Sequence, residues 1–368
     1  MKNNTCVYIH WPWCRNICNY CDYYKYKSLG NLKNNIIYNA YLRDLKILKY
    51  YALKKKIVSI NIGGGSPSIM DIDLLRKIIQ YILSNFQIYP NVEISIEINP
   101  EDITVEMLQE YKKIGINRVC LGIQSFSDTE LQFLGRQYDK VTAINSILES
   151  SYYFDNVAID LLYGIPGSNL ESFEKNLYLS RDLPIKHISL NEFDYQDMSK
   201  PMYVRDISFL NNNKEILKEK KFIFYEISSF CKKNFQSKYN VSVLDMKSFF
   251  GIGPSSYSRM IQNNDVIKLR NTSNLVNWMN SQEDTFIKET MRPAEIIEEF
   301  LLLGLYKCNG IKIEELKKIT NGSLYKYINA KNIEQLEKNN FLYIKKGRLF
   351  LSTRGMLLIN TIVSKVLI

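Results

Sequence analysis

The sequence lacks any run of about 18 apolar residues, the length that a helix needs to cross a bilayer. It opens without a secretory signal, and its seven cysteines are an odd number, four of them scattered singly. These absences argue against a membrane span and a disulfide framework, and they predict a cytoplasmic protein. With 368 residues and 46% hydrophobic content, the chain is long enough for one large domain and one smaller domain.

An acidic excess is also absent. Lysine and arginine number 48 against 38 aspartates and glutamates, which gives a formal net charge of +10. The lysines are spread along the whole chain and do not gather in one patch. The charge therefore permits an anionic ligand, nucleic acid or an acidic membrane surface as a partner without selecting one of them.

Three of the cysteines stand close together after a β-branched and aromatic run that is typical of a strand. Cys14, Cys18 and Cys21 have the spacing C-x3-C-x2-C. Three thiolates can hold an iron-sulfur cube and leave one iron free, so the spacing favours a cluster that acts on a bound molecule. A closed zinc site of these cysteines with His10 is the alternative, although zinc modules usually pair two separated two-ligand knuckles.

Strand-like runs alternate with amphipathic stretches through the first half of the chain. Six alternations predict an α/β fold with a parallel sheet and crossover helices. Functional residues are then expected in the loops at the C-terminal ends of the strands. We expect strands over 6–9, 57–62, 92–98, 118–123, 156–162 and 187–190, with helices over 34–53, 72–86, 104–114, 141–150 and 170–180.

Unusual residues stand at the ends of these predicted strands. Gly63-Gly64-Gly65-Ser66 follows the second strand, and glycines let a ligand approach the backbone closely, although such a run is also a common turn. Glu97 alternates with isoleucines, so its carboxylate points away from them, either into the mouth of the sheet or into water. Asp160 interrupts an apolar run, where a buried carboxylate needs a partner.

The cysteine spacing, with Tyr20 just before the last cysteine, resembles the cluster loop of radical S-adenosylmethionine (SAM) enzymes. The segment Tyr8-Ile9-His10-x-Pro12-x-Cys14 resembles the form found in the oxygen-independent coproporphyrinogen III oxidase family. The resemblance implies a partial (β/α)6 radical SAM barrel with a small C-terminal winged-helix-like α+β domain. It also implies a [4Fe-4S] cluster on Cys14, Cys18 and Cys21, with the amino and carboxylate groups of SAM on the free iron.

The family also suggests which residues contact the cofactor, because each position matches one of its motifs. Arg136 taken alone would be a helix-end arginine, but it follows Gln124 at the family's spacing. Asp160 would pair with a ribose hydroxyl or with Arg136. The implied contacts are Tyr8, Tyr20, Gly64, Gly65, Ser66, Glu97, Gln124, Arg136, Asp160, Asp194 and Tyr257.

The resemblance divides the chain into three parts. Residues 1–200 form the barrel core, with the cluster loop at 10–24, residues 201–290 extend the barrel, and residues 291–368 form the C-terminal domain. We expect a helix over 202–221. In the C-terminal domain we expect three helical stretches and a closing hairpin. Its lysines scatter over helices and hairpin alike, so no nucleic-acid partner is expected.

Two positions bear on the substrate. The oxidases carry a further cysteine where this chain has Tyr23, and they have an N-terminal extension, whereas here the cluster loop begins almost at the first residue. Both differences favour the heme chaperone branch of the family. That branch carries an H-N-x-x-Y-W motif, of which only Asn240 remains here, with Tyr239 in place of the histidine. Tyrosinate can ligate ferric heme, so Tyr239 is a candidate heme ligand.

We therefore predict a heme chaperone that binds a SAM-ligated [4Fe-4S] cluster and heme, and that delivers heme to an acceptor protein. Its other expected partner is an electron donor such as flavodoxin or ferredoxin, and delivery allows a peripheral membrane contact. The alternative is a coproporphyrinogen III oxidase that abstracts hydrogen from propionate side chains and releases carbon dioxide. A zinc-dependent structural or nucleic-acid module is the third hypothesis.

Overall fold

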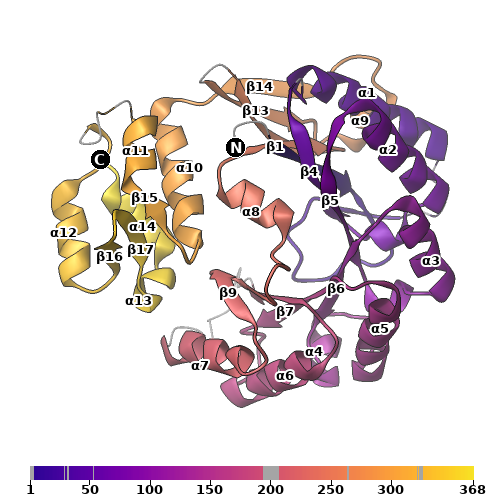
Figure 1. Cartoon of the computed structure of the whole chain (residues 1–368). Coiled ribbons are helices and arrows are strands. Elements are labelled where there is room, and N and C mark those ends of the chain that lie inside the picture. Colours follow the sequence, from indigo (N-terminus) through magenta and orange to yellow (C-terminus); the bar gives the residue numbers. More distant parts are fainter. Residues whose placement is uncertain are drawn as a thin grey trace.

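The computed structural model describes residues 4–28, 30, 33–52, 54–193, 207–262, 265–320, 322 and 326–368. One curved sheet runs through most of the described chain, and its centre consists of six parallel strands that neighbour one another in chain order (Figure 1). This confirms the predicted parallel sheet. The six strands are β1 (Asn4–Trp11), β4 (Lys56–Gly64), β5 (Gln87–Ile98), β6 (Arg118–Gln124), β7 (Val157–Tyr163) and β8 (His187–Glu192).

Helices connect these strands and cover the outer, convex side of the sheet (Figure 1). Their apolar residues recur at helical spacing, so each helix buries one face; α2, for example, buries Leu74, Ile78 and Ile82. Aspartate or threonine at the N-cap often marks where a helix begins, as Asp71 does for α2. The helices are α1 (Asn34–Ala52), α2 (Ile72–Asn85), α3 (Val105–Ile114), α4 (Asp128–Phe133), α5 (Lys140–Tyr153) and α6 (Leu170–Asp182).

Further strands extend the same sheet at both edges. β11 (Ser248–Ile252) pairs in parallel with β1, and β12 (Tyr257–Gln262), β13 (Asp265–Asn271) and β14 (Phe286–Thr290) follow as antiparallel neighbours. At the other edge, β10 (Ser229–Cys231) and β9 (Ile223–Glu226) pair antiparallel with β8 and with each other. The described part of the expected barrel extension therefore belongs to the main sheet.

Short elements complete this part of the chain. α8 crosses the inner, concave side of the sheet, where it contacts β1, β4 and β11 (Figure 1). α7 begins at Ile207, and residues 202–206 of the expected helix lie outside the described residues. The elements are β2 (Trp13–Cys14), β3 (Tyr26–Lys27), the 3-10 turns η1 (Pro67–Ile69) and η2 (Pro100–Asp102), α7 (Ile207–Lys218), α8 (Lys238–Leu244) and α9 (Leu275–Asn280).

The C-terminal part has a hydrophobic core of its own, which begins at Ile297 and ends at Val366. The expected hairpin forms, but two helices follow it that the sequence analysis did not predict. No helix of the described residues is long and apolar enough to cross a membrane. The elements are α10 (Pro293–Tyr306), β15 (Ile311–Lys312), α11 (Ile313–Ile319), α12 (Ala330–Lys338), β16 (Leu342–Lys345), β17 (Arg348–Leu351), α13 (Thr353–Met356) and α14 (Ile359–Val366).

Candidate functional site

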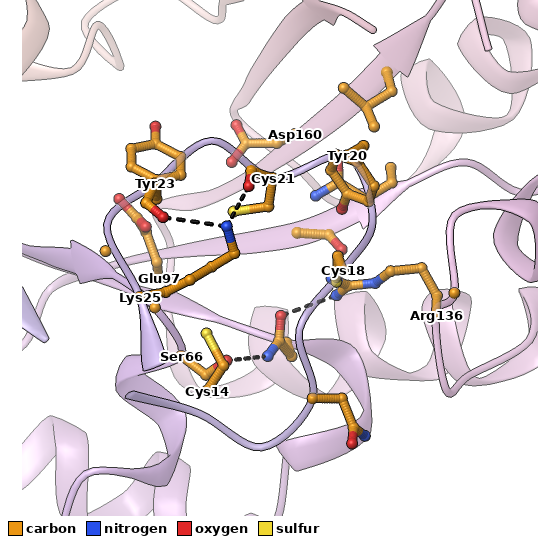
Figure 2. Close-up of a pocket in the computed structure, with 18 of the residues that line it drawn as sticks. Cys14, Cys18, Tyr20, Cys21, Tyr23, Lys25, Ser66, Glu97, Arg136 and Asp160 are labelled. Carbon is orange, nitrogen blue, oxygen red and sulfur yellow. Dashed lines mark hydrogen bonds between the residues drawn. The ribbon is translucent and has the colours of Figure 1, made fainter. Parts of the chain in front are cut away.

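A cavity of about 520 Å³ lies at the C-terminal ends of the parallel strands, as expected for a sheet of this kind. Its volume suits one small molecule. The segment after β1, which includes β2, contributes the three cysteines, and the ends of β4 to β8 and the turn after α4 contribute the rest of the wall (Figure 2). Of the predicted site residues, those lining the cavity are Cys14, Cys18, Tyr20, Cys21, Gly64, Gly65, Ser66, Glu97, Gln124, Arg136 and Asp160.

The three cysteines are free thiols that surround one side of this cavity. Cys14 is buried, while Cys18 and Cys21 are half-buried. In the described residues, no group of three His, Cys, Asp or Glu side chains is arranged to hold a single metal ion. Three thiols beside an open cavity are the donor set that a [4Fe-4S] cluster with one open iron requires, so the residues present fit such a cluster.

His10 does not act as a fourth ligand in this arrangement. Its Nε2 lies 2.9 Å from the backbone oxygen of Tyr24, and because a carbonyl can only accept, Nε2 carries the proton and donates. Nδ1 is then an acceptor for the Tyr8 hydroxyl, 3.4 Å away. Burial lowers the pKa of His10, which keeps the ring neutral. His10 thus joins Tyr8 on β1 to the end of the cluster loop.

Glycines form the floor beneath the cluster loop because no side chain fits there. A Cβ on Gly65 would lie 2.6 Å from the Trp13 backbone oxygen and 3.0 Å from Cys14 Sγ. Gly64 has a φ of +108°, and a Cβ there would lie 2.6 Å from His10 Nδ1. The backbone N–H groups of Gly65 and Ser66 donate to the Trp11 and Trp13 carbonyls. The glycine run and the cluster loop are therefore one packed unit.

Gly65→Ala is expected to reduce cluster assembly several-fold, because the new methyl group would push Trp13 and Cys14 away from their positions. Iron and sulfide per chain after anaerobic reconstitution measure the effect. Gly167→Ala is the control: nothing lies within 4 Å of its Cβ, and its φ of +81° adds a backbone strain that Gly65→Ala does not carry, so strain alone would penalise the control more. Equal iron content in the two variants would contradict the packing argument.

Arg136 joins the cluster loop to the glycine run. Its Nη1 donates to Cys18 Sγ at 3.3 Å, and its Nη2 donates to Asn99 Oδ1 at 2.9 Å. Asn99 in turn donates to Ser66 Oγ at 3.0 Å (Figure 2). The Arg136 Nε–H is buried with no partner among the described protein groups, so it has a free donor. A buried free donor of this kind suits a bound anionic or polar ligand.

Glu97 and Asp160 place two carboxylates in the cavity wall. Burial, followed by the charge of Asp160, raises the pKa of Glu97 to about 7, although Asn61 donates to it at 3.4 Å. Burial also raises the pKa of Asp160, which accepts the Cys120 thiol at 3.3 Å. Two carboxylates in a poorly solvated pocket favour a cation between or beside them. Among the described residues, Arg136 pairs with Glu101 at 3.9 Å and not with Asp160, which the resemblance gave as one of two possible partners.

Gln124 ends β6 in a left-handed conformation, with a φ of +63°. This conformation is unusual for a residue with a side chain and needs support from its surroundings. The support lies in the next turn, where Ser125 Oγ donates to Glu130 at 2.5 Å and Asn176 Oδ1 accepts from the Phe126 N–H at 3.1 Å. This buried network holds Gln124 at the cavity wall.

The aromatic residues of the predicted site lie at different depths. Tyr20 lines the cavity and packs against Phe193, with ring centroids 6.3 Å apart. Tyr8 is not among the cavity-lining residues, and burial together with the charge of Glu97 raises the pKa of its hydroxyl well above its usual range. Tyr257 lies on β12 against Phe249 and is not among the cavity-lining residues, so its cofactor contact stays a prediction. Asp194 lies outside the described residues.

Tyr239 lies on α8, with its ring 5.9 Å from that of Tyr8. Burial raises the pKa of its hydroxyl, and the charges of Cys6 and Glu97 raise it further. The surroundings therefore favour a neutral phenol over tyrosinate in the heme-free protein. Its role as a heme ligand stays a prediction.

Asn99 and Lys25 are two of the cavity residues that the sequence analysis did not predict. Asn99 bridges Ser66 and Arg136. Its position directly after β5, two residues beyond Glu97, could have identified it from the sequence. Lys25 lies at the end of the cluster loop and points its ammonium group back into the cavity (Figure 2). A lysine in a lysine-rich sequence carries no signal by itself, because only the turn of the loop brings it to the site.

Comparisons with known proteins agree with this site. Residues 8–177 match the family model of the radical SAM superfamily, and residues 291–358 match that of the HemN C-terminal domain. A protein of Buchnera aphidicola from Acyrthosiphon pisum named heme chaperone HemW is 31% identical, over 94% of this chain and 96% of its own. The heme chaperone HemW of Lactococcus lactis is 25% identical, over 100% of this chain and 98% of its own.

A solved structure shows the same fold over almost the whole chain. The coproporphyrinogen III oxidase HemN of Escherichia coli superposes with a TM-score of 0.83 and 18% identity, covering 99% of this chain and 90% of that one. At this identity the match establishes the fold alone, which confirms the predicted α/β radical SAM fold with its C-terminal domain. Together with the 31% identical relative, these matches show that the chain belongs to the radical SAM superfamily, in the family of the proteins named heme chaperone HemW.

Proposed function

We propose that this protein is a heme chaperone: it binds heme, carries a SAM-ligated [4Fe-4S] cluster and delivers heme to an acceptor protein. The observation that carries the proposal is the match, over 94% of the chain, to a relative named heme chaperone HemW. The cavity supports it, since its donor groups agree with the cofactors of the superfamily. The heme cargo, the acceptor and an electron donor such as flavodoxin or ferredoxin are part of the proposal.

The residues present fit both cofactors. Cys14, Cys18 and Cys21 would hold the cluster, and the cluster together with SAM would supply one-electron radical chemistry in this cavity. Glu97 and Asp160 would face the cationic portion of SAM. Figure 2 shows Glu97 and Asp160 in the same cavity as the three cysteines. The glycine floor keeps side chains out of the space beside Cys14.

The oxidase alternative fits less well. Tyr23 occupies the position of the oxidases' further cysteine, and 63% of its surface is exposed at the cavity. A phenol at this place cannot supply the thiol that those enzymes have. The seven cysteines are all free, which fits a reducing compartment such as the cytoplasm and supports that location as part of the proposal.

One anaerobic preparation tests both functions. The protein is reconstituted with iron and sulfide, SAM is added, and the sample is divided. One half is titrated with hemin, and a saturable, shifted Soret band is expected. The other half receives coproporphyrinogen III and a reductant, and no carbon dioxide release above the background is expected. Turnover of coproporphyrinogen III without saturable hemin binding would replace the chaperone with the oxidase.

Tyr239→Phe tests the candidate heme ligand. If Tyr239 binds ferric heme as tyrosinate, the variant should lose the charge-transfer features of a tyrosinate complex and bind hemin at least tenfold more weakly. Tyr152→Phe is the control and should leave the heme spectrum unchanged, because Tyr152 lies on α5, is 82% exposed and does not line the cavity. Unchanged spectra and affinity in Tyr239→Phe would remove Tyr239 from the heme site.

A further inference from the structure

Three basic residues line the cavity: Arg15, Lys25 and Arg136. Arg15 pairs with Asp102 at 3.0 Å, and Arg136 lies 3.9 Å from Glu101. Lys25 is the one basic residue of the cavity with no carboxylate within 4.0 Å among the residues that the structure describes. Its charge therefore has no carboxylate partner in the described protein, and the acidic groups that remain beside it are the thiols of the cluster loop.

The Lys25 ammonium has backbone partners only. It donates to the Cys21 and Tyr23 carbonyl oxygens of the cluster loop, the latter at 3.2 Å. An ammonium group has three donors, so one N–H remains for a ligand. The side chain is half-buried, and a half-buried charge without a counter-ion is costly unless an anion binds.

The backbone on both sides of Lys25 is fixed. The Tyr24 carbonyl bonds to His10 Nε2 at 2.9 Å, and the Tyr26 N–H donates to the Pro12 carbonyl at 2.7 Å. β3 then pairs with β2, so the start of the lysine side chain has little freedom. The ammonium is thus presented to the cavity by a rigid segment, in the way that a binding site needs.

The charges of the cavity are divided between its parts. In Figure 2, Lys25 extends between Cys14 and Cys21, and Arg136 approaches Cys18 from the other side of the loop. The carboxylates of Glu97 and Asp160 belong to the strands behind the loop. A ligand with a cationic part and a carboxylate would place the cation toward these two strands and the carboxylate toward the basic groups at the loop.

From this geometry we infer that Lys25 binds a carboxylate of the ligand in the cavity, and that it is a specificity residue of the proposed function. The inference rests on that function. Two ligands supply the same chemistry: the amino-acid carboxylate of SAM and a heme propionate. A lysine forms a charge-assisted bond with either, and removing its charge is expected to weaken binding about tenfold or more.

The test compares Lys25→Gln, Lys25→Arg and Lys27→Gln in anaerobically reconstituted protein. Glutamine keeps a donor for the loop carbonyls but has no charge, and arginine keeps the charge. Lys27 is exposed, lies two residues away and does not line the cavity, so it is the matched control. Each variant is titrated with SAM, decarboxylated SAM, hemin and hemin dimethyl ester, after its iron content has been measured.

If Lys25 binds the SAM carboxylate, Lys25→Gln weakens SAM about tenfold and leaves decarboxylated SAM unchanged. If it binds a propionate, hemin weakens and its dimethyl ester does not. In both cases the ligand affinity of Lys25→Arg stays within about threefold of that of the wild type, and the affinity of Lys27→Gln equals that of the wild type. The inference would be overturned if Lys25→Gln lost affinity equally for a ligand with its carboxylate and for the form without a free carboxylate. Unchanged affinity for every ligand, or loss of the cluster in Lys25→Gln, would also overturn it.

The outcomes also separate this inference from the proposed function. If the wild type shows no saturable hemin binding, the chaperone proposal fails. The titrations with SAM and decarboxylated SAM still test the role of Lys25. If hemin binds the wild type and Lys25→Gln equally, the chaperone proposal stands and the role of Lys25 in heme binding fails. If the wild type binds neither SAM nor hemin, no carboxylate is present for Lys25 and the inference is wrong.

Discussion

Replacing any one of Cys14, Cys18 or Cys21 with alanine is expected to lower cluster iron from about four atoms per chain to almost none. A cube with three protein ligands already has one iron without a protein ligand. Removing a second thiolate leaves the cluster too weakly held to stay on the protein. Visible absorption, iron and sulfide after anaerobic reconstitution measure the effect. Because SAM would bind the cluster, the same variants are expected to lose the spectral change that SAM causes in the wild type.

The other cysteines provide the controls. Cys6 and Cys231 are buried in the sheet, and Cys308 and Cys120 are half-buried. Alanine at these four positions should leave the iron content near that of the wild type. Cys120 needs separate attention, because its thiol donates to Asp160 in the cavity. Loss of the cluster in Cys6→Ala would contradict the assignment of three ligands.

Asp44→Ala is expected to lower the free energy of unfolding by about 3–5 kcal/mol, because it leaves several buried donors without an acceptor. Asp44 lies on α1 with none of its surface exposed. One oxygen accepts from the Gly253 N–H at 3.0 Å, from Asn271 at 2.8 Å and from Trp278 at 3.0 Å. It therefore holds α1 to the turn after β11, to β13 and to α9.

The midpoint of urea unfolding measures this effect, with Asp73→Ala as the control. Asp73 lies on α2 and 75% of its side chain is exposed, so its removal should change stability by no more than about 0.5 kcal/mol. Similar midpoints for the two variants would contradict the role of Asp44.

Burial raises the pKa of Asp44 from 3.8 to about 6. The folded state then binds more protons than the unfolded state between these values. The contribution of this carboxyl group to stability is therefore greatest below about pH 4 and falls as the pH rises to about 6. Asp44→Asn cannot titrate, so the difference in stability between wild type and variant should change with pH over this range. A constant difference would argue against a raised pKa.

The parallel strands could be predicted because each is a short apolar run between helical stretches. These strands also neighbour one another in the sheet in the same order as in the sequence. β9, β10, β12, β13 and β14 could not be predicted in the same way, since they pair antiparallel and the regular alternation of parallel strands and crossover helices does not describe them. β11 pairs in parallel with β1 across more than two hundred residues, and nothing in the local sequence indicates such a partner. The helices after the final hairpin were missed for a similar reason, because the short α13 interrupts the pattern.

The site was predictable where spacing or an unusual residue type identifies it. The cysteine triplet, the glycine run and Asp160 each stand out in the sequence, and they line one cavity. Lys25 and Asp44 do not stand out, because lysine and aspartate are common on solvent-exposed surfaces. Their roles follow from tertiary contacts: the return of the cluster loop for Lys25, and the packing of α1 against the turn after β11 for Asp44.

Transfer of heme tests the central claim most directly. The reconstituted protein with SAM is loaded with one equivalent of hemin, separated from free hemin and mixed with the heme-free form of a heme protein. The acceptor's Soret band is then followed over time. A heme chaperone predicts that the bound heme leaves this protein and appears stoichiometrically in the acceptor. Protein that emerges from the separation without heme, and that releases carbon dioxide from coproporphyrinogen III, would contradict the account.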